Sequence, residues 1–115
     1  MAPKSGNDLL RGTLDVLILK VLTWQVLHGY GIARLLEERT GDVLRIEEGS
    51  LYPALYRLES RGWIEAEWGT SELGRRAKFY RLTPVGRREL DQQTTRWRDF
   101  SRAVDSVLLD AEAMS

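Results

Sequence analysis

The sequence predicts a mainly α-helical (α+β) fold, with three short helices, a two-stranded β-hairpin and one long C-terminal helix in that order. Two observations support this fold class. Apolar residues recur every three or four positions in three segments before residue 62, which is the spacing of one face of an α-helix. From residue 63 the apolar period changes to two, as in a half-buried strand, and a helical period returns after residue 83.

The first two predicted helices are separated by a glycine-rich break. The first helix contains LLRGTLDVLILKVLTW, in which Leu14, Leu17 and Ile18 belong to a strongly amphipathic pattern. The break is HGYGI, and the second helix continues through IARLLEERTG, with Gly41 as its expected stop. His28 precedes the break, and we interpret it as a polar residue at a helix boundary.

The third predicted helix lies in GSLYPALYRLESRGW, where a proline falls inside the helical pattern. Leu51, Leu55 and Leu58 occupy one apolar stripe, so they are expected to face the core. Pro53 is acceptable if Ser50 is the N-cap, because the first N–H groups of a helix have no intrahelical acceptor. On that assignment Pro53 stiffens the first turn and removes no hydrogen bond of the helix.

The opposite side of this helix predicts a contact with nucleic acid. A helix in the major groove contacts bases with its N-terminal residues, and an outward arginine can donate two hydrogen bonds to guanine. The alternative for the tyrosines is packing on the hairpin, since a tyrosine can bury its ring and expose only its hydroxyl. The DNA-contacting residues expected on the helices are Tyr30, Ser50, Tyr52, Pro53, Tyr56 and Arg57.

The charge of the chain is sorted along its length, although 17 basic and 17 acidic residues give a formal net charge of zero. Six basic residues and one acid lie between residues 70 and 88, whereas four acids and one arginine lie between residues 99 and 112. On the tip of the predicted hairpin, Arg75, Arg76 and Lys78 are expected to neutralise phosphates of double-stranded DNA. The alternative is a solvated basic loop.

The last helix is predicted to run from about residue 84 to near residue 110, with Thr83 as N-cap and Pro84 at its first position. Such a helix is roughly 40 Å long, too long to lie wholly within so small a domain. Its apolar residues follow a heptad seam, which is typical of helices that pair with another helix. The alternative is packing on the first helix of the same chain. The expected homodimer interface is Leu14, Leu17, Leu90, Trp97, Phe100, Val104, Val107 and Leu108.

Several classes of protein are not expected from this sequence. The chain has no cysteine and one histidine, so thiol chemistry and zinc–thiolate sites are excluded and a catalytic triad would depend on His28 alone. No carboxylate cluster or glycine-rich phosphate loop indicates a metal or a cofactor. Because no catalytic, metal or cofactor motif is present, we expect a protein that is not an enzyme. No signal peptide and no run of about 18 apolar residues is present, so we expect it to be cytoplasmic.

Three stretches together resemble the PadR family of bacterial transcription regulators: HGYGI, GSLYPALYRLESRGWI and KFYRLTPVGRREL. The resemblance covers about residues 9–90 in the right order and spacing. It implies a dimeric winged-helix repressor whose third helix is the recognition helix and whose dimer forms through the C-terminal helix and part of the first. It also implies control by a small molecule or by cell state, often of genes for detoxification, transport or phenolic-acid metabolism.

A multidrug-binding subset of that family places a tryptophan of the C-terminal helix at the dimer interface, where paired indoles hold flat aromatic ligands. Trp97 falls on the equivalent stretch and on the heptad seam, and we expect it to fill the dimer interface, as large aromatic residues at a seam do. The alternative is an effector pocket for a small aromatic or amphipathic molecule at Trp97 and Phe100.

The whole sequence therefore predicts a winged helix-turn-helix DNA-binding domain over residues 1–83 and a dimerisation helix over residues 84–115. The expected function is a sequence-specific, ligand-responsive repressor that binds a pseudo-palindromic operator as a homodimer. The alternative is a winged-helix module that binds proteins without recognising a DNA sequence. The basic hairpin favours DNA, because a protein-binding wing would be uncharged or acidic.

Overall fold

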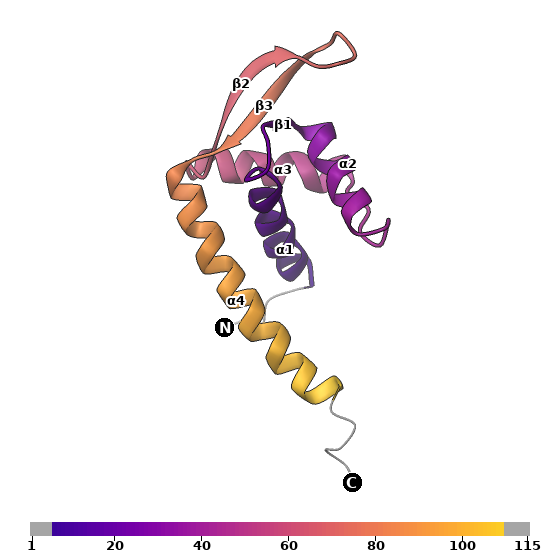
Figure 1. Ribbon diagram of the computed structural model, residues 1–115, viewed down its shortest axis with the longest axis vertical. Coiled ribbons are helices and arrows are strands. Elements are labelled where there is room, and N and C mark those ends of the chain that lie inside the picture. Colours follow the sequence, from indigo (N-terminus) through magenta and orange to yellow (C-terminus); the bar gives the residue numbers. More distant parts are fainter. Residues whose placement is uncertain (1–5, 110–115) are drawn as a thin grey trace.

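The computed structural model describes residues 6–109, and the side chains from residue 12 onward. The elements follow in the order α1 (Gly6–Val21), β1 (Leu27–His28), α2 (Gly29–Arg39), α3 (Glu48–Ser60), β2 (Ile64–Thr70), β3 (Arg76–Leu82) and α4 (Pro84–Leu108). Three helices form the body, a hairpin rises from one end, and α4 runs away from the body at the other (Figure 1). The predicted α+β class with a long C-terminal helix is confirmed.

The core lies where the first three helices meet the base of the sheet. Ile18, Ile32 and Leu58 are fully buried, one from each of α1, α2 and α3. The sheet contributes Ile64 and Tyr80 to the same cluster. These positions are the apolar stripes of the sequence, so the spacing of three and four residues placed the inner face of each helix correctly.

The sheet has three antiparallel strands in the order β1-β3-β2. The hairpin, which we call the wing (β2, β3 and the turn between them), pairs Ile64 with Leu82 at its base and Thr70 with Arg76 near its tip. The third strand is a difference from the predicted two, because Leu27 and His28 pair with Tyr80 and Phe79. Two residues are too few to display a period, so the sequence carried no signal for β1.

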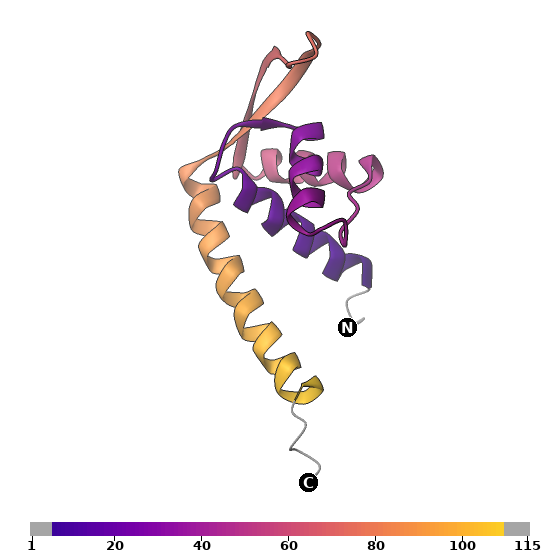
Figure 2. The same cartoon turned by 45° about the vertical axis from the view of Figure 1, so that its right-hand side comes forward.

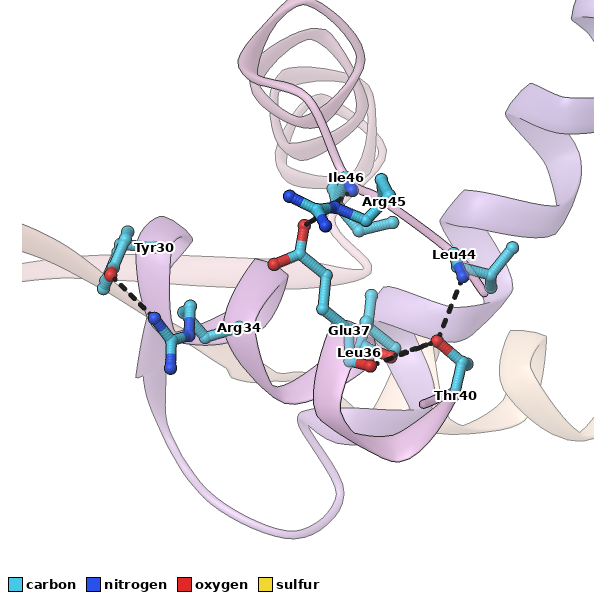
Figure 3. Close-up of polar contacts among 8 residues, drawn as sticks. All are labelled: Tyr30, Arg34, Leu36, Glu37, Thr40, Leu44, Arg45 and Ile46. Atoms are coloured by element: carbon cyan, nitrogen blue, oxygen red, sulfur yellow. Dashed lines mark hydrogen bonds and ion pairs between the residues drawn. The ribbon is translucent and has the colours of Figure 1, made fainter. Parts of the chain in front are cut away.

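The turn between α2 and α3 is held by side chains of the last turn of α2. The hydroxyl of Thr40 accepts a hydrogen bond from the amide of Leu44 at 3.2 Å and donates to the carbonyl of Leu36 (Figure 3). The carboxylate of Glu37 accepts from the amide of Ile46 at 2.9 Å. Because these bonds satisfy the backbone of the turn, they fix where α3 begins.

The start of α3 is a correction to the sequence analysis. The N-cap is Glu47 and not Ser50, because the amides of Ser50 and Leu51 already donate to the Glu47 carbonyl at 3.0 and 2.9 Å. Pro53 is therefore the sixth helical residue, and it does remove one backbone hydrogen bond, the one that would end on the Gly49 carbonyl. The helix nevertheless continues through it to Ser60.

The start of α4 is held against the end of α3. As predicted, Thr83 is the N-cap, and its hydroxyl accepts from the amide of Gly86 at 3.0 Å. The same hydroxyl lies 2.6 Å from the Gly62 carbonyl, to which it donates. A Cβ at Gly86 would stand 1.9 Å from the Trp63 carbonyl oxygen, so only glycine allows this close approach. The 25 residues of α4 extend about 37 Å, and Leu90 is the last buried residue among those that the structure describes in this helix. The far part of α4 runs away from the body (Figure 2).

Candidate nucleic-acid interface

The outer side of α3 is exposed along its length. Leu51, Leu55 and Leu58 are buried, as expected, whereas Tyr52 and Tyr56 are 49% and 74% exposed. Pro53 and Ser50 are also exposed. The helix thus presents two aromatic rings and a proline ring to the outside from a rigid support.

Arg57 does not project outward, and this expectation is wrong. Its Nη2 lies 2.8 Å from Oδ1 of Asp15 on α1, and the two side chains are 23% and 12% exposed. The Nε of Arg57 is buried and has no hydrogen-bond partner among the described residues. The carboxylate of Asp15 is buried, and burying a charged carboxylate without a partner costs free energy. Arg57 of α3 lies within reach and supplies that partner. Arg57 was expected to face outward because arginine is rarely buried, but this general tendency takes no account of a buried carboxylate nearby.

The start of α2, one side of α3 and the wing enclose an open hollow of about 670 Å³, which we call the wing hollow. It brings together five of the expected DNA-contacting residues, from three elements distant in sequence. Its lining consists of His28, Gly29, Tyr30, Tyr52, Trp68, Ser71, Glu72, Leu73, Arg75, Arg76, Ala77, Lys78 and Tyr80.

The three expected cations of the wing differ in their surroundings. Arg75 ends the turn and is exposed. Arg76 belongs to β3, and its guanidinium lies over the Trp68 ring at 5.0 Å. Lys78 also belongs to β3 and lies 3.2 Å from Glu59 of α3. The tip itself instead carries Glu72 and the exposed Leu73, so Arg76 and Lys78 are strand residues and not tip residues.

Two of the three tyrosines that line the wing hollow are positioned by close contacts. The ring of Tyr52 stands 3.2 Å from where a Cβ of Gly29 would lie, so the first residue of α2 must be small for the ring to fit. The hydroxyl of Tyr30 accepts a hydrogen bond from Nη1 of Arg34 at 3.3 Å (Figure 3). That bond raises the pKa of Arg34 and holds a cation beside an exposed ring. The third, Tyr80, is mostly buried, and this burial raises its pKa.

His28 is the N-cap of α2, which confirms its interpretation as a helix-boundary residue. Its Nδ1 accepts from the amide of Gly31 at 2.9 Å, so this nitrogen carries no proton. The ring meets Phe79 of β3 edge-on, with 5.2 Å between ring centroids, and its Nε2 lies 3.8 Å from Glu72. His28 therefore joins the start of α2 to the wing.

A second hollow lies on the other side of α3, and we call it the α1 hollow. It measures about 400 Å³ and is bordered by α1, the turn before α3 and the first turns of α3. Ser50, Pro53 and Arg57 line it, so the expected contact residues divide between two sides of one helix.

One side of the far half of α4 carries apolar side chains that are largely exposed in the described chain. Trp97 and Phe100 are 51% and 49% exposed, with their ring centroids 6.1 Å apart. Val107 and Leu108 are about three-quarters exposed, whereas Val104 is partly covered.

Two residues expected at the dimer interface are already covered within the chain. Leu14 and Leu90 are 9% and 5% exposed, because the first part of α4 packs on α1. They have little surface to offer a partner. Leu17 of α1 is only partly buried and keeps some.

Residues 6–109 contain no group of three histidines or acids that could hold a metal ion. Over the same residues, none of the helices combines the length and apolar character of a membrane span.

Comparison with known proteins agrees with this geometry. The sequence profile of the "Transcriptional regulator PadR-like family" matches residues 18–92. A transcriptional regulator of Mycobacterium tuberculosis is 35% identical over 85% of this chain and 88% of its own length. The structure of a transcriptional regulator from Clostridium thermocellum superposes with a TM-score of 0.80 at 31% identity, covering 88% of this chain and 98% of the other. A PadR family transcription regulator from Clostridium difficile gives 0.70 at 31% identity, covering 83% and 97%.

Proposed function

Because the chain belongs to the PadR-like family of transcriptional regulators, we propose that it represses transcription as a homodimer bound to a pseudo-palindromic operator. The observation that carries this proposal is the exposed outer side of α3, which stands beside a hollow bordered by three cationic side chains of the wing. The exposed side of such a helix can enter the major groove of DNA. A neighbouring hollow lined by cations can then follow the phosphate backbone along the edge of that groove.

In the proposed complex, the first turns of α3 enter the major groove and the wing hollow covers the adjoining backbone. Arg75 and Arg76 neutralise phosphates there, and the hydroxyls of Tyr30 and Tyr52 donate to phosphate oxygens. Lys78 contributes less than the two arginines, because Glu59 already shares its charge. Arg57 supports α3 from behind and touches no base.

The proposed dimer covers the exposed half of α4. A continuous apolar face on a projecting helix is unfavourable in water, and a two-fold dimer is the most frequent way of covering one. Leu17, Trp97, Phe100, Val104, Val107 and Leu108 supply the contact. Two α3 helices related by that axis would stand about 34 Å apart and meet half-sites one DNA turn apart.

The proposed effector site lies at Trp97 and Phe100, where two neighbouring aromatic rings are half exposed in each chain. A flat aromatic or amphipathic molecule would stack on the indoles of both chains. Titration of a planar cationic dye should quench tryptophan fluorescence, and Trp97→Ala should abolish that quenching. The same quenching in the variant would leave Trp97 as interface filling alone.

Electrophoretic mobility shift tests the DNA proposal. The probe is the DNA upstream of the protein's own gene, at about 50 mM and about 200 mM salt, where each neutralised phosphate makes affinity more salt-dependent. The expected result is a discrete complex that weakens steeply with salt and survives excess unrelated DNA. Absence of any complex at the lower salt would favour the protein-binding alternative. Sedimentation of the free protein at twice the chain mass tests the dimer separately.

A further inference from the structure

The outer side of α3 has an unusual composition for a DNA-contacting helix. At about 100° per residue, the positions opposite the buried leucines are Gly49, Tyr52, Pro53, Tyr56 and Ser60, which we call the recognition face. All five are exposed. None of them is an arginine, lysine, asparagine or glutamine, the residues that make paired hydrogen bonds to guanine or adenine.

Three cations near this face are engaged within the molecule, whereas the exposed Arg45 lines the α1 hollow together with Pro53. Arg57 is ion-paired with Asp15 at 2.8 Å, as described above. The guanidinium of Arg61 lies over the Trp63 ring at 5.0 Å and 3.9 Å from Asp15. The ammonium of Lys78 lies 3.2 Å from Glu59. The recognition face therefore meets DNA with rings and hydroxyls, without a paired hydrogen-bond donor.

From this composition we propose that the recognition face identifies thymine, through apolar contact of Pro53 and Tyr56 with the C5-methyl groups in the major groove. The inference rests on the proposed function, because it assumes that α3 enters that groove. The thymine methyl is the one apolar group that a base pair presents there, and it distinguishes thymine from every other unmodified base. Hydroxyls of Tyr52, Tyr56 and Ser60 make single hydrogen bonds, which fit several bases and phosphates equally.

The test removes only the methyl group. A duplex selected by the protein from a randomised pool is remade with deoxyuridine in place of one thymine at a time, which keeps pairing and every hydrogen-bonding group. Affinity should fall about fourfold for each thymine under α3, the worth of one buried methyl, and remain unchanged at other thymines. Replacing such a thymine–adenine pair with cytosine–guanine should weaken binding, and 5-methylcytosine should restore part of the loss.

Variants connect the effect to the two side chains. In Pro53→Ala and Tyr56→Ala, the difference between thymine and deoxyuridine should shrink to less than twofold at one position each. Tyr56→Phe is the matched control, because it keeps the ring and should keep the full difference. Tyr56 is 74% exposed and Pro53→Ala supplies the helical N–H that proline lacks, so circular dichroism should show the fold unchanged.

The outcomes separate this inference from the function on which it rests. A specific complex that binds thymine and deoxyuridine duplexes equally overturns the inference and leaves DNA binding intact. Selected sites that require cytosine at the start of α3 also overturn it, since they would assign base contact to the carboxylates of Glu47 and Glu48. Failure to select any sequence counts against the proposed function itself.

Discussion

On the α1 flank of α3, Arg57 and Asp15 form an ion pair whose side chains are 23% and 12% exposed, whereas on the wing flank Lys78 and Glu59 are 39% and 37% exposed. The two pairs have similar chemistry and similar distances, 2.8 and 3.2 Å. They differ in how much water reaches the charged groups. The covered pair helps to hold α3 on α1, and the open pair leaves its cation beside the hollow where we place DNA.

Residue type therefore does not decide the role of a cation that lies on or beside α3. Arg57 and Lys78 would each be assigned to DNA from sequence. Arg57 instead contributes to packing, whereas Lys78 both pairs with Glu59 and lies beside the wing hollow. Burial decides, because a covered charge needs its partner for stability while an exposed pair contributes about 0–1 kcal/mol. Substitutions on the two flanks should therefore change different measurements.

Asp15→Ala should have the largest effect on stability. It leaves the mostly covered guanidinium of Arg57 without its carboxylate, so the free energy of unfolding should fall by about 2–4 kcal/mol in urea titration. Arg57→Ala should lose a similar amount. The double variant should lose less than the sum of the two, since the residues act as a pair. A loss below about 0.5 kcal/mol for Asp15→Ala would show that the flanks do not differ.

Arg76→Ala should change DNA binding and leave stability within about 0.5 kcal/mol, because its guanidinium lies on the exposed Trp68 ring. Affinity for every sequence should fall about five- to tenfold at low salt, and the slope of log affinity against log salt should decrease by about 1. Filter binding at several salt concentrations measures both. Arg102→Ala is the matched control near the C-terminal end of α4, and its slope should not change. A loss restricted to one sequence would contradict a phosphate role.

The comparison of the flanks also marks how far the sequence could predict this site. Local signals were sufficient where the deciding neighbours are adjacent in the chain. Thr83 and Pro84 predicted the start of α4, and the result agrees, since an N-cap bond spans three residues. Arg57 was placed wrongly because Asp15 lies 42 positions away and no local pattern pairs them.

The positions of Ser50 and Pro53 within α3 were also predicted wrongly, again because the deciding contact joins residues that are distant in sequence. The N-cap is Glu47, because the carboxylate of Glu37 accepts a hydrogen bond from the amide of Ile46, nine positions after Glu37. This bond allows the helix to begin earlier than predicted. The wing hollow could not be predicted as a hollow, because three separate elements form it. Its residues could nevertheless be proposed one by one from their types, and Tyr30, Tyr52 and Arg76 do meet there.

His28→Ala tests whether any residue of the wing hollow also carries stability. It removes the acceptor of the Gly31 amide at the N-terminus of α2, so unfolding free energy should fall by about 1 kcal/mol. His28→Asn should recover most of the loss, since asparagine is a good N-cap residue. Thermal unfolding of the three proteins decides this. An unchanged midpoint in His28→Ala would mean that the cap formed by His28 contributes nothing to stability.

Glu59→Gln should have the smallest effect on stability and gives the sharpest contrast with Asp15→Ala. It removes the carboxylate of an exposed pair, so unfolding free energy should change by less than about 0.5 kcal/mol. It also releases the ammonium of Lys78 and removes a negative charge beside the wing hollow, so affinity for DNA should rise about two- to fivefold. Lys78→Ala is the matched control, because in the double variant it should remove the part of the gain that comes from releasing Lys78 and leave the smaller part that comes from the lost negative charge. If Glu59→Gln instead weakens binding, the pair positions the wing against α3, and Lys78 belongs with Arg57 among the residues that support the helix.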